Sequence, residues 1–201
     1  MNRRVFSFDS PDRFICGAVG QPGQRTFYLQ ASKGSQVVSV ALEKAQVAVL
    51  AERLATLLLA LRQGGVEISD GTAELVAPMP SLSEPVIEQF RVGTLTIGWD
   101  GDRERIVIEA LELTEEDDDF DDESGEEESA ESEAEEEATL LPADSEDGPD
   151  LVRVQLEPDA ALAFASGAVA VVQAGRPPCP NCGAPLEPTG HFCLLRNGLQ
   201  N

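Results

Sequence analysis

Four side chains near the C-terminus have the types and spacing of a metal site, namely Cys179, Cys182, His191 and Cys193. Their pattern is Cys-x2-Cys-x8-His-x-Cys, and three cysteines with one histidine are a common ligand set for tetrahedral zinc. Gly183 permits the positive φ that a tight turn after the second cysteine needs. A site with four protein ligands has no open position for water, so the pattern predicts a structural zinc. The alternatives are a tail with reduced thiols or a redox-active cysteine pair.

The rest of the chain offers few parts for catalysis. The only histidine is already assigned to the metal, and no glycine-rich phosphate-binding motif is present. Cys16 alternates with apolar residues and is interpreted as a core cysteine. Asp100 and Asp102 flank a glycine between two strand patterns, which is typical of a turn. An enzyme is therefore disfavoured.

An alternative function stays open at this point. Four side chains could form a site for an unknown small anionic ligand in an enzyme or an enzyme subunit: Arg25, Lys44, Arg91 and Asp100. Tyr28 and Trp99 are interpreted as sheet-surface and core residues and not as a ligand box.

Residues 115–147 carry 19 Asp and Glu and no Lys or Arg. Such a composition buries too little apolar surface to offset its ordering entropy, so the sequence predicts a disordered acidic loop over 114–150. One interpretation is a solubilising loop. The other is a lure for a basic partner, or a decoy for a partner's nucleic-acid site. The spacing does not match a calcium-binding loop.

The remainder of the chain has 18 acids and 14 bases, which is the balance of an ordinary domain. The bases are scattered and form no stripe that could follow a phosphate backbone, so nucleic acid is not expected as a partner. No apolar run is long enough to span a bilayer, and the N-terminus has no export signal. We therefore expect a cytoplasmic protein with no membrane association and with an unidentified protein as its partner.

Period-two alternation predicts strands at Val5–Asp9, Arg13–Val19, Thr26–Ala31, around Val38–Leu42, Gly93–Trp99, Arg105–Leu113 and Leu151–Leu156. Apolar residues at helical spacing predict a helix from about Glu43 to Gln63, which Gly64-Gly65 ends. A second helix is predicted at Ala160–Gln173, opened by Pro158-Asp159. Short connections between the early strands favour an antiparallel meander.

We therefore expect an α+β fold in which two helices pack on an antiparallel sheet. The predicted domain covers residues 1–175 and is interrupted by the acidic loop at 114–150. A zinc-knuckle tail follows at 176–201. Strands on both sides of the acidic loop indicate that it lies inside one domain.

Several short motifs occur together in one order. They are Pro11-Asp12-Arg13-Phe14, Arg25-Thr26-Phe27-Tyr28-Leu29-Gln30-Ala31, Val40-Ala41-Leu42-Glu43-Lys44, Phe90-Arg91-Val92-Gly93-Thr94 with Trp99-Asp100, and Gly175-Arg176-Pro177-Pro178-Cys179-Pro180. In these the chain resembles an uncharacterised actinobacterial family, domain of unknown function 3090. The resemblance covers nearly the whole chain and implies a cytoplasmic bacterial setting but no activity. The family's tail tends to continue with proline after the last cysteine, whereas Leu194-Leu195 stand here.

The function that fits these observations is a protein-interaction or adaptor module with a structural zinc. The motivating features are the closed ligand set, the missing catalytic parts and the acidic segment.

Overall fold

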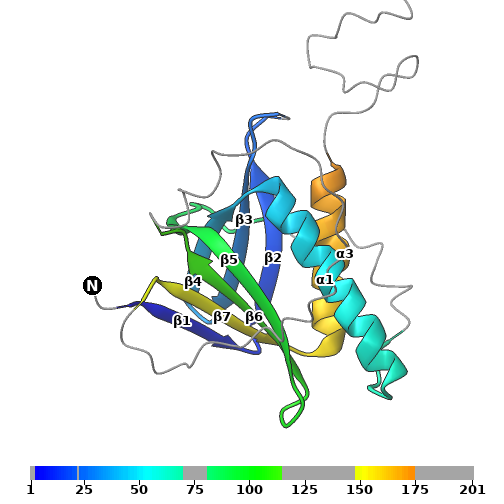
Figure 1. Ribbon diagram of the computed structural model, residues 1–201. Coiled ribbons are helices and arrows are strands. Elements are labelled where there is room, and N and C mark those ends of the chain that lie inside the picture. The colour runs from blue at the N-terminus through cyan, green and yellow to red at the C-terminus, as the bar shows by residue number, and fades with distance from the viewer. Residues whose placement is uncertain (1–2, 22, 70–80, 115–147, 175–201) are drawn as a thin grey trace, which may run out of the picture.

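The computed structural model of the chain describes residues 3–21, 23–69, 81–114 and 148–174 (Figure 1). These residues form a seven-stranded sheet with two long helices on one side, in the order β1-β7-β6-β5-β4-β3-β2. The strands are β1 (Val5–Asp9), β2 (Arg13–Val19), β3 (Thr26–Lys33), β4 (Gln36–Leu42), β5 (Glu88–Asp100), β6 (Arg105–Glu112) and β7 (Leu151–Leu156). The helices are α1 (Lys44–Gln63) and α3 (Pro158–Gln173). The predicted α+β class with two helices is thus confirmed.

The prediction of an antiparallel sheet was wrong for two of its strand pairs. β2, β3 and β4 form the expected antiparallel meander, and β5, β6 and β7 also pair antiparallel. β4 and β5, however, are parallel, and so are β1 and β7. The first parallel pair arises because α1 lies in the connection between β4 and β5 and returns the chain to the end where β4 began. The sheet is therefore mixed.

Both helices begin where local sequence signals predicted. The backbone N–H of Glu43, the residue before α1, donates to Oε1 of Gln46 at 2.8 Å, which is one half of a capping box. The Gln46 amide group also donates to the carbonyls of Val92 and Gly93, where β5 carries a bulge. Pro158 starts α3 with its fixed φ. Gln46 thus ties the start of α1 to the strand that follows it in the chain.

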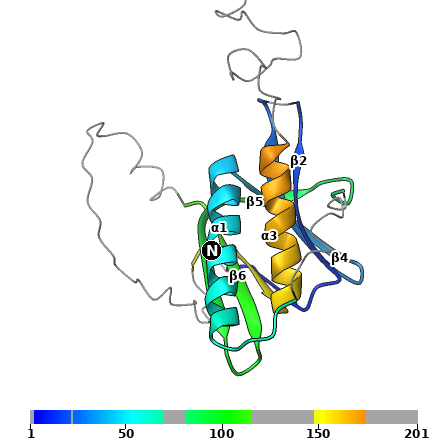
Figure 2. The same ribbon diagram turned by 90° about the vertical axis from the view of Figure 1, so that its right-hand side faces the viewer.

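The core lies between the two helices and the sheet face that they cover (Figure 2). The helices lie side by side in opposite directions, each with one buried stripe. Phe14 of β2 stacks on Phe164 of α3 with ring centroids 4.4 Å apart. The buried residues of the helices are Val47, Leu50, Ala51, Leu54 and Leu58 of α1 and Ala161, Phe164, Ala165 and Ala168 of α3. Their burial supplies the main free energy that holds the helices on the sheet.

The opposite face of β2, β3 and β4 carries the segment that leads into β5. Gln30 of β3 is 2% exposed, and its amide group donates to the Ser83 carbonyl and accepts from the Ser83 N–H. Arg13 donates to the Ser81 carbonyl and to the Ser83 hydroxyl. Leu82 lies so close to Gly17 that a Cβ there would come within 2.5 Å of it. We call residues 81–83 the strap.

Candidate functional site

The four predicted metal ligands Cys179, Cys182, His191 and Cys193 lie outside the described residues. Within the ranges that the structure does describe, no group of three or more His, Cys, Asp or Glu side chains could hold a metal ion. The zinc site therefore stays a prediction. The tail that carries it follows directly on the end of α3 at Ala174.

The acidic segment joins two neighbouring antiparallel strands. β6 ends at Glu112, β7 begins at Leu151, and the two strands pair up to that end, with Leu111 opposite Leu151. Beyond the paired residues, the Glu112 N–H still donates to the Asp150 carbonyl at 2.9 Å. Residues 115–147 themselves lie outside the description, so the predicted disorder stays a prediction. The described residues on either side of the segment, Glu112 and Asp150, nevertheless lie next to each other.

Asp150 connects this end of β6 and β7 to the residues at the start of the N-terminal strand β1. Its carboxylate accepts from the Arg4 backbone N–H at 2.8 Å and from Arg4 Nε at 2.6 Å. Arg4 Nη2 lies 2.5 Å from the same carboxylate, and the Leu151 N–H donates to the Arg4 carbonyl. The Asp150 side chain is 11% exposed and that of Arg4 is 55% exposed, and charge-assisted hydrogen bonds are stronger than neutral ones. The acidic segment is thus anchored by three strands, β1, β6 and β7.

A second charged pair is buried between β6 and β7. Glu109 and Arg153 stand opposite each other in register, and Arg153 Nε and Nη2 lie 2.6 and 2.5 Å from Glu109 Oε1. Glu109 is 0% and Arg153 8% exposed. The alternating pattern of Leu151–Leu156 predicts that Arg153 points outward, opposite Val152 and Val154; it does lie on that opposite face, but the prediction that this face is exposed was wrong. A glutamate inside the apolar run of β6 was the signal that could have revealed the pair.

Cys16 is a core residue, as expected. It is 1% exposed, and burial raises the pKa of its thiol from 9.0 to about 12. Loss of solvation disfavours the thiolate, which is the nucleophilic form of cysteine. Cys16 is therefore not a catalytic nucleophile.

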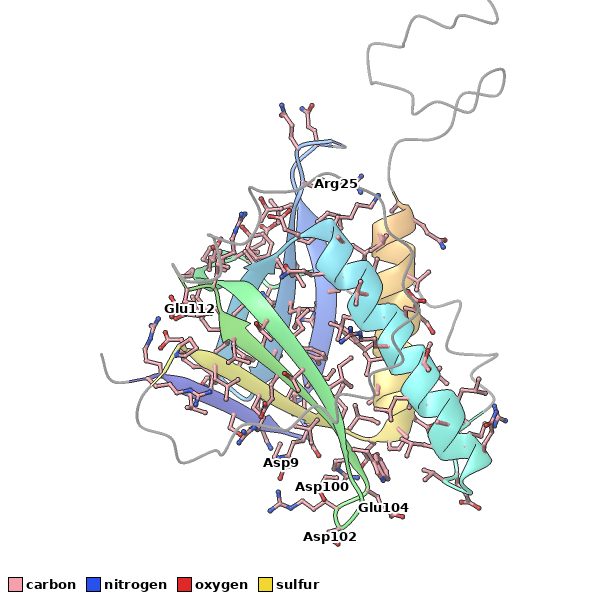
Figure 3. All side chains as sticks on the ribbon, in the orientation of Figure 1. Asp9, Arg25, Asp100, Asp102, Glu104 and Glu112 are labelled. Carbon is pink, nitrogen blue, oxygen red and sulfur yellow. The ribbon has the colours of Figure 1, made fainter. Side chains whose placement is uncertain are left out.

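The four residues of the alternative anion site do not come together. Arg25 and Lys44 lie at the end of the sheet where β3 begins and β4 ends, and Arg91 is nearby on β5. Asp100 lies at the far end of β5, as Figure 3 shows from the positions of Arg25 and Asp100. The prediction of this candidate site was wrong, because β5 is long and places Asp100 far from the other three residues.

These side chains also have structural partners. Arg25 donates to the Ala174 carbonyl at the end of α3 at 2.6 Å, and Arg91 pairs with Glu43 at 3.1 Å. Asp100 Oδ1 accepts from the backbone N–H groups of Asp102 and Arg103, which closes the turn predicted there.

The core holds an apolar cavity of about 10 Å³, which has room for roughly one water molecule. Its lining includes Phe14, Val40 and Ile108 and has no charged residue. A substrate does not fit there.

Fold and contacts together define an α+β protein with a mixed sheet, two helices on one side and an acidic segment anchored at the β6–β7 end. The model of the family described as "Protein of unknown function (DUF3090)" matches residues 6–193, and the chain belongs to this family, as its sequence motifs indicated. Searches of curated proteins and of solved structures found no significant match. In the described part of the chain, no helix is both long and apolar enough to cross a membrane.

Proposed function

We propose that this chain is a protein-interaction module that presents residues 115–147 to a basic partner protein. The observation that carries the proposal is the anchoring of the residues on either side of the segment, since β6, β7 and the Arg4–Asp150 pair hold these flanking residues together. The segment between these residues carries 19 Asp and Glu and no Lys or Arg. A concentrated charge raises the rate at which a partner of opposite charge is encountered.

The distribution of charge over the chain supports this function. Without the segment the formal charge falls from −23 to −4, so the body neither attracts nor repels a basic protein strongly. The body then acts as the scaffold from which the segment is displayed. Cys16, which is the one cysteine among the described residues, is buried, and burial keeps its thiol protonated. A protonated thiol is a poor nucleophile, so Cys16 supports a role in interaction over one in catalysis.

The proposal includes a structural zinc in the tail, with Cys179, Cys182, His191 and Cys193 as ligands. Metal binding would supply folding free energy that so short a tail cannot obtain from a core of its own. The test is metal analysis of the purified protein. One zinc per chain is expected in wild type and less than a tenth of that in Cys182→Ser, while zinc-free wild-type protein would contradict the assignment.

The partner is tested by capture from lysate of the host, with four forms of the protein as bait. These are wild type, a form lacking residues 115–147, a form with the segment's Asp and Glu changed to Asn and Gln, and a form with the segment scrambled. We expect a basic protein on wild type and on the scrambled form but not on the other two. Because the attraction is electrostatic, its retention should decrease steeply as salt is raised.

Two results would reject the proposal. One is capture of the same proteins by the neutral and wild-type segments, since charge would then not be the determinant. The other is the absence of any basic protein whose retention depends on the segment. Circular dichroism of all four baits establishes that the body is folded in each.

A further inference from the structure

Arg3, near the start of β1, has a guanidinium group without an acceptor. Its Nε and Nη2 atoms are buried, and neither has a hydrogen-bond partner among the described residues. Figure 1 shows where this group belongs, because the start of β1 lies beside the start of β7. The side chain also passes close to Gly148, where an added Cβ would lie 3.9 Å from Arg3 Cδ. Arg3 therefore stands beside the first described residue after the acidic segment.

The two acidic residues that flank the segment are already engaged elsewhere. Asp150 accepts from Arg4 Nε at 2.6 Å, and Arg4 Nη2 lies 2.5 Å from the same oxygen. Glu112 Oε2 accepts from the Asp150 N–H at 3.3 Å. Neither carboxylate has a hydrogen bond to Arg3. Arg4 thus has a counter-ion in the described structure, whereas Arg3 needs one from elsewhere.

The chemistry of the guanidinium indicates which acceptor it takes. It stays charged at every pH at which the protein is folded, and Nε and Nη2 present two parallel N–H groups that match the two oxygens of a carboxylate. Water can accept these hydrogen bonds but does not neutralise the charge, and a buried charge without a counter-ion is costly. A phosphate also fits the two N–H groups, but its second negative charge is disfavoured beside a segment with 19 acids and no bases.

We propose that the Nε–Nη2 edge of Arg3 is a binding site for a carboxylate. Two sources can supply this group. One is the chain itself, which has Asp144, Glu146 and Asp147 within four residues of Gly148. The other is a small carboxylate molecule from solution. This site goes beyond the proposed interaction function, because it depends on Arg3 and an anion and not on the attraction of a basic partner.

The test is nuclear magnetic resonance of the Arg3 Nε–H group in the full chain. Arg3→Lys, which keeps the positive charge, identifies the signal by its loss. A bound carboxylate protects this hydrogen from exchange with water. We therefore expect exchange at least tenfold slower than at Arg103, whose side chain is 68% exposed, once the carboxylate is bound.

Two variants and one titration distinguish the sources. One variant changes the three acids nearest Gly148 to amides, and its matched control changes three acids farther along the segment. These variants are Asp144→Asn with Glu146→Gln and Asp147→Asn, and Glu126→Gln with Glu127→Gln and Glu128→Gln. If the chain supplies the carboxylate, the protection at Arg3 is present in wild type and in the control and falls at least tenfold in the first variant. If a small molecule supplies it, the protection develops only when sodium acetate is added, and sodium chloride at the same ionic strength has no such effect.

Two results would overturn the proposal. One is exchange at Arg3 as fast as at Arg103 in wild type, both with and without acetate. The other is protection that neither variant reduces and that acetate does not change, since burial alone would then account for it. Far-ultraviolet circular dichroism verifies that the variants are folded. Neither result bears on the acidic-segment proposal, because lysate capture tests that separately.

Discussion

At the scale of single residues, the thiol of Cys16 connects burial to pH. Burial raises its pKa to about 12, so above pH 9 the folded protein keeps a proton that the unfolded chain releases. The stability that Cys16 contributes is therefore complete below pH 9 and decreases as the pH rises from 9 toward 12. The decrease is on the order of 1 kcal/mol per pH unit.

The measurement is urea unfolding of wild type and Cys16→Ala at pH 8, 9.5 and 10.5 in the presence of reductant. Wild type should be the more stable form at pH 8, and the difference should shrink at each higher pH. A difference in unfolding free energy that is constant over this range would mean that the thiol does not titrate as described.

The second prediction at the scale of residues concerns the Glu109–Arg153 pair. Arg153→Met takes the guanidinium away from a carboxylate that is 0% exposed and should destabilise the protein by about 3–5 kcal/mol. Changing both residues, Glu109→Leu with Arg153→Met, removes the charge as well as its partner and should recover most of that loss. Chemical denaturation of wild type, Glu109→Leu, Arg153→Met and the double variant measures this. A double variant no more stable than Arg153→Met would show that the two side chains are not coupled.

At the scale of elements, Gln30 determines where the strap lies. Its amide group holds Ser83 through a pair of hydrogen bonds in a buried position, so Gln30→Met should cost about 1–3 kcal/mol. Hydrogen exchange at the Ser83 amide should accelerate at least tenfold, while amides in the centre of α1 should change only with global stability. Gln36→Met, at an exposed position of β4, is the matched control. Unchanged protection at Ser83 would show that the strap is held by other contacts.

At the scale of the whole molecule, the β6–β7 connection should be replaceable. Exchanging residues 115–147 for a connection of about four residues lowers the entropy cost of closing the loop by about 2 kcal/mol. Removing 19 like charges also relieves repulsion. The shortened protein should therefore melt several degrees higher, with the same far-ultraviolet circular dichroism. A lower melting temperature would show that residues 115–147 contribute contacts to the body.

The sequence alone determined the local elements and the face of each that enters the apolar core. Alternation at Phe27, Leu29 and Ala31 placed β3 in the core, and the helical spacing from Val47 to Leu58 gave the buried stripe of α1. These signals are local, since strand and helix periods are properties of neighbouring residues. The motifs spread along the chain also indicated its family, which the match over residues 6–193 confirmed.

Tertiary structure alone decided which strands are neighbours and which polar residues meet. The pairing of β1 with β7 brings Arg4 to Asp150, and the pairing of β6 with β7 brings Glu109 to Arg153. The length of β5 likewise separates Asp100 from Arg25. Contacts between residues distant in sequence depend on the order and register of the strands. A period-two pattern identifies a strand but is the same whichever strand lies beside it, so it does not predict these contacts. The acidic composition was therefore evident from the sequence, whereas the meeting of the residues on either side of the acidic segment, at the ends of the neighbouring strands β6 and β7, required the fold.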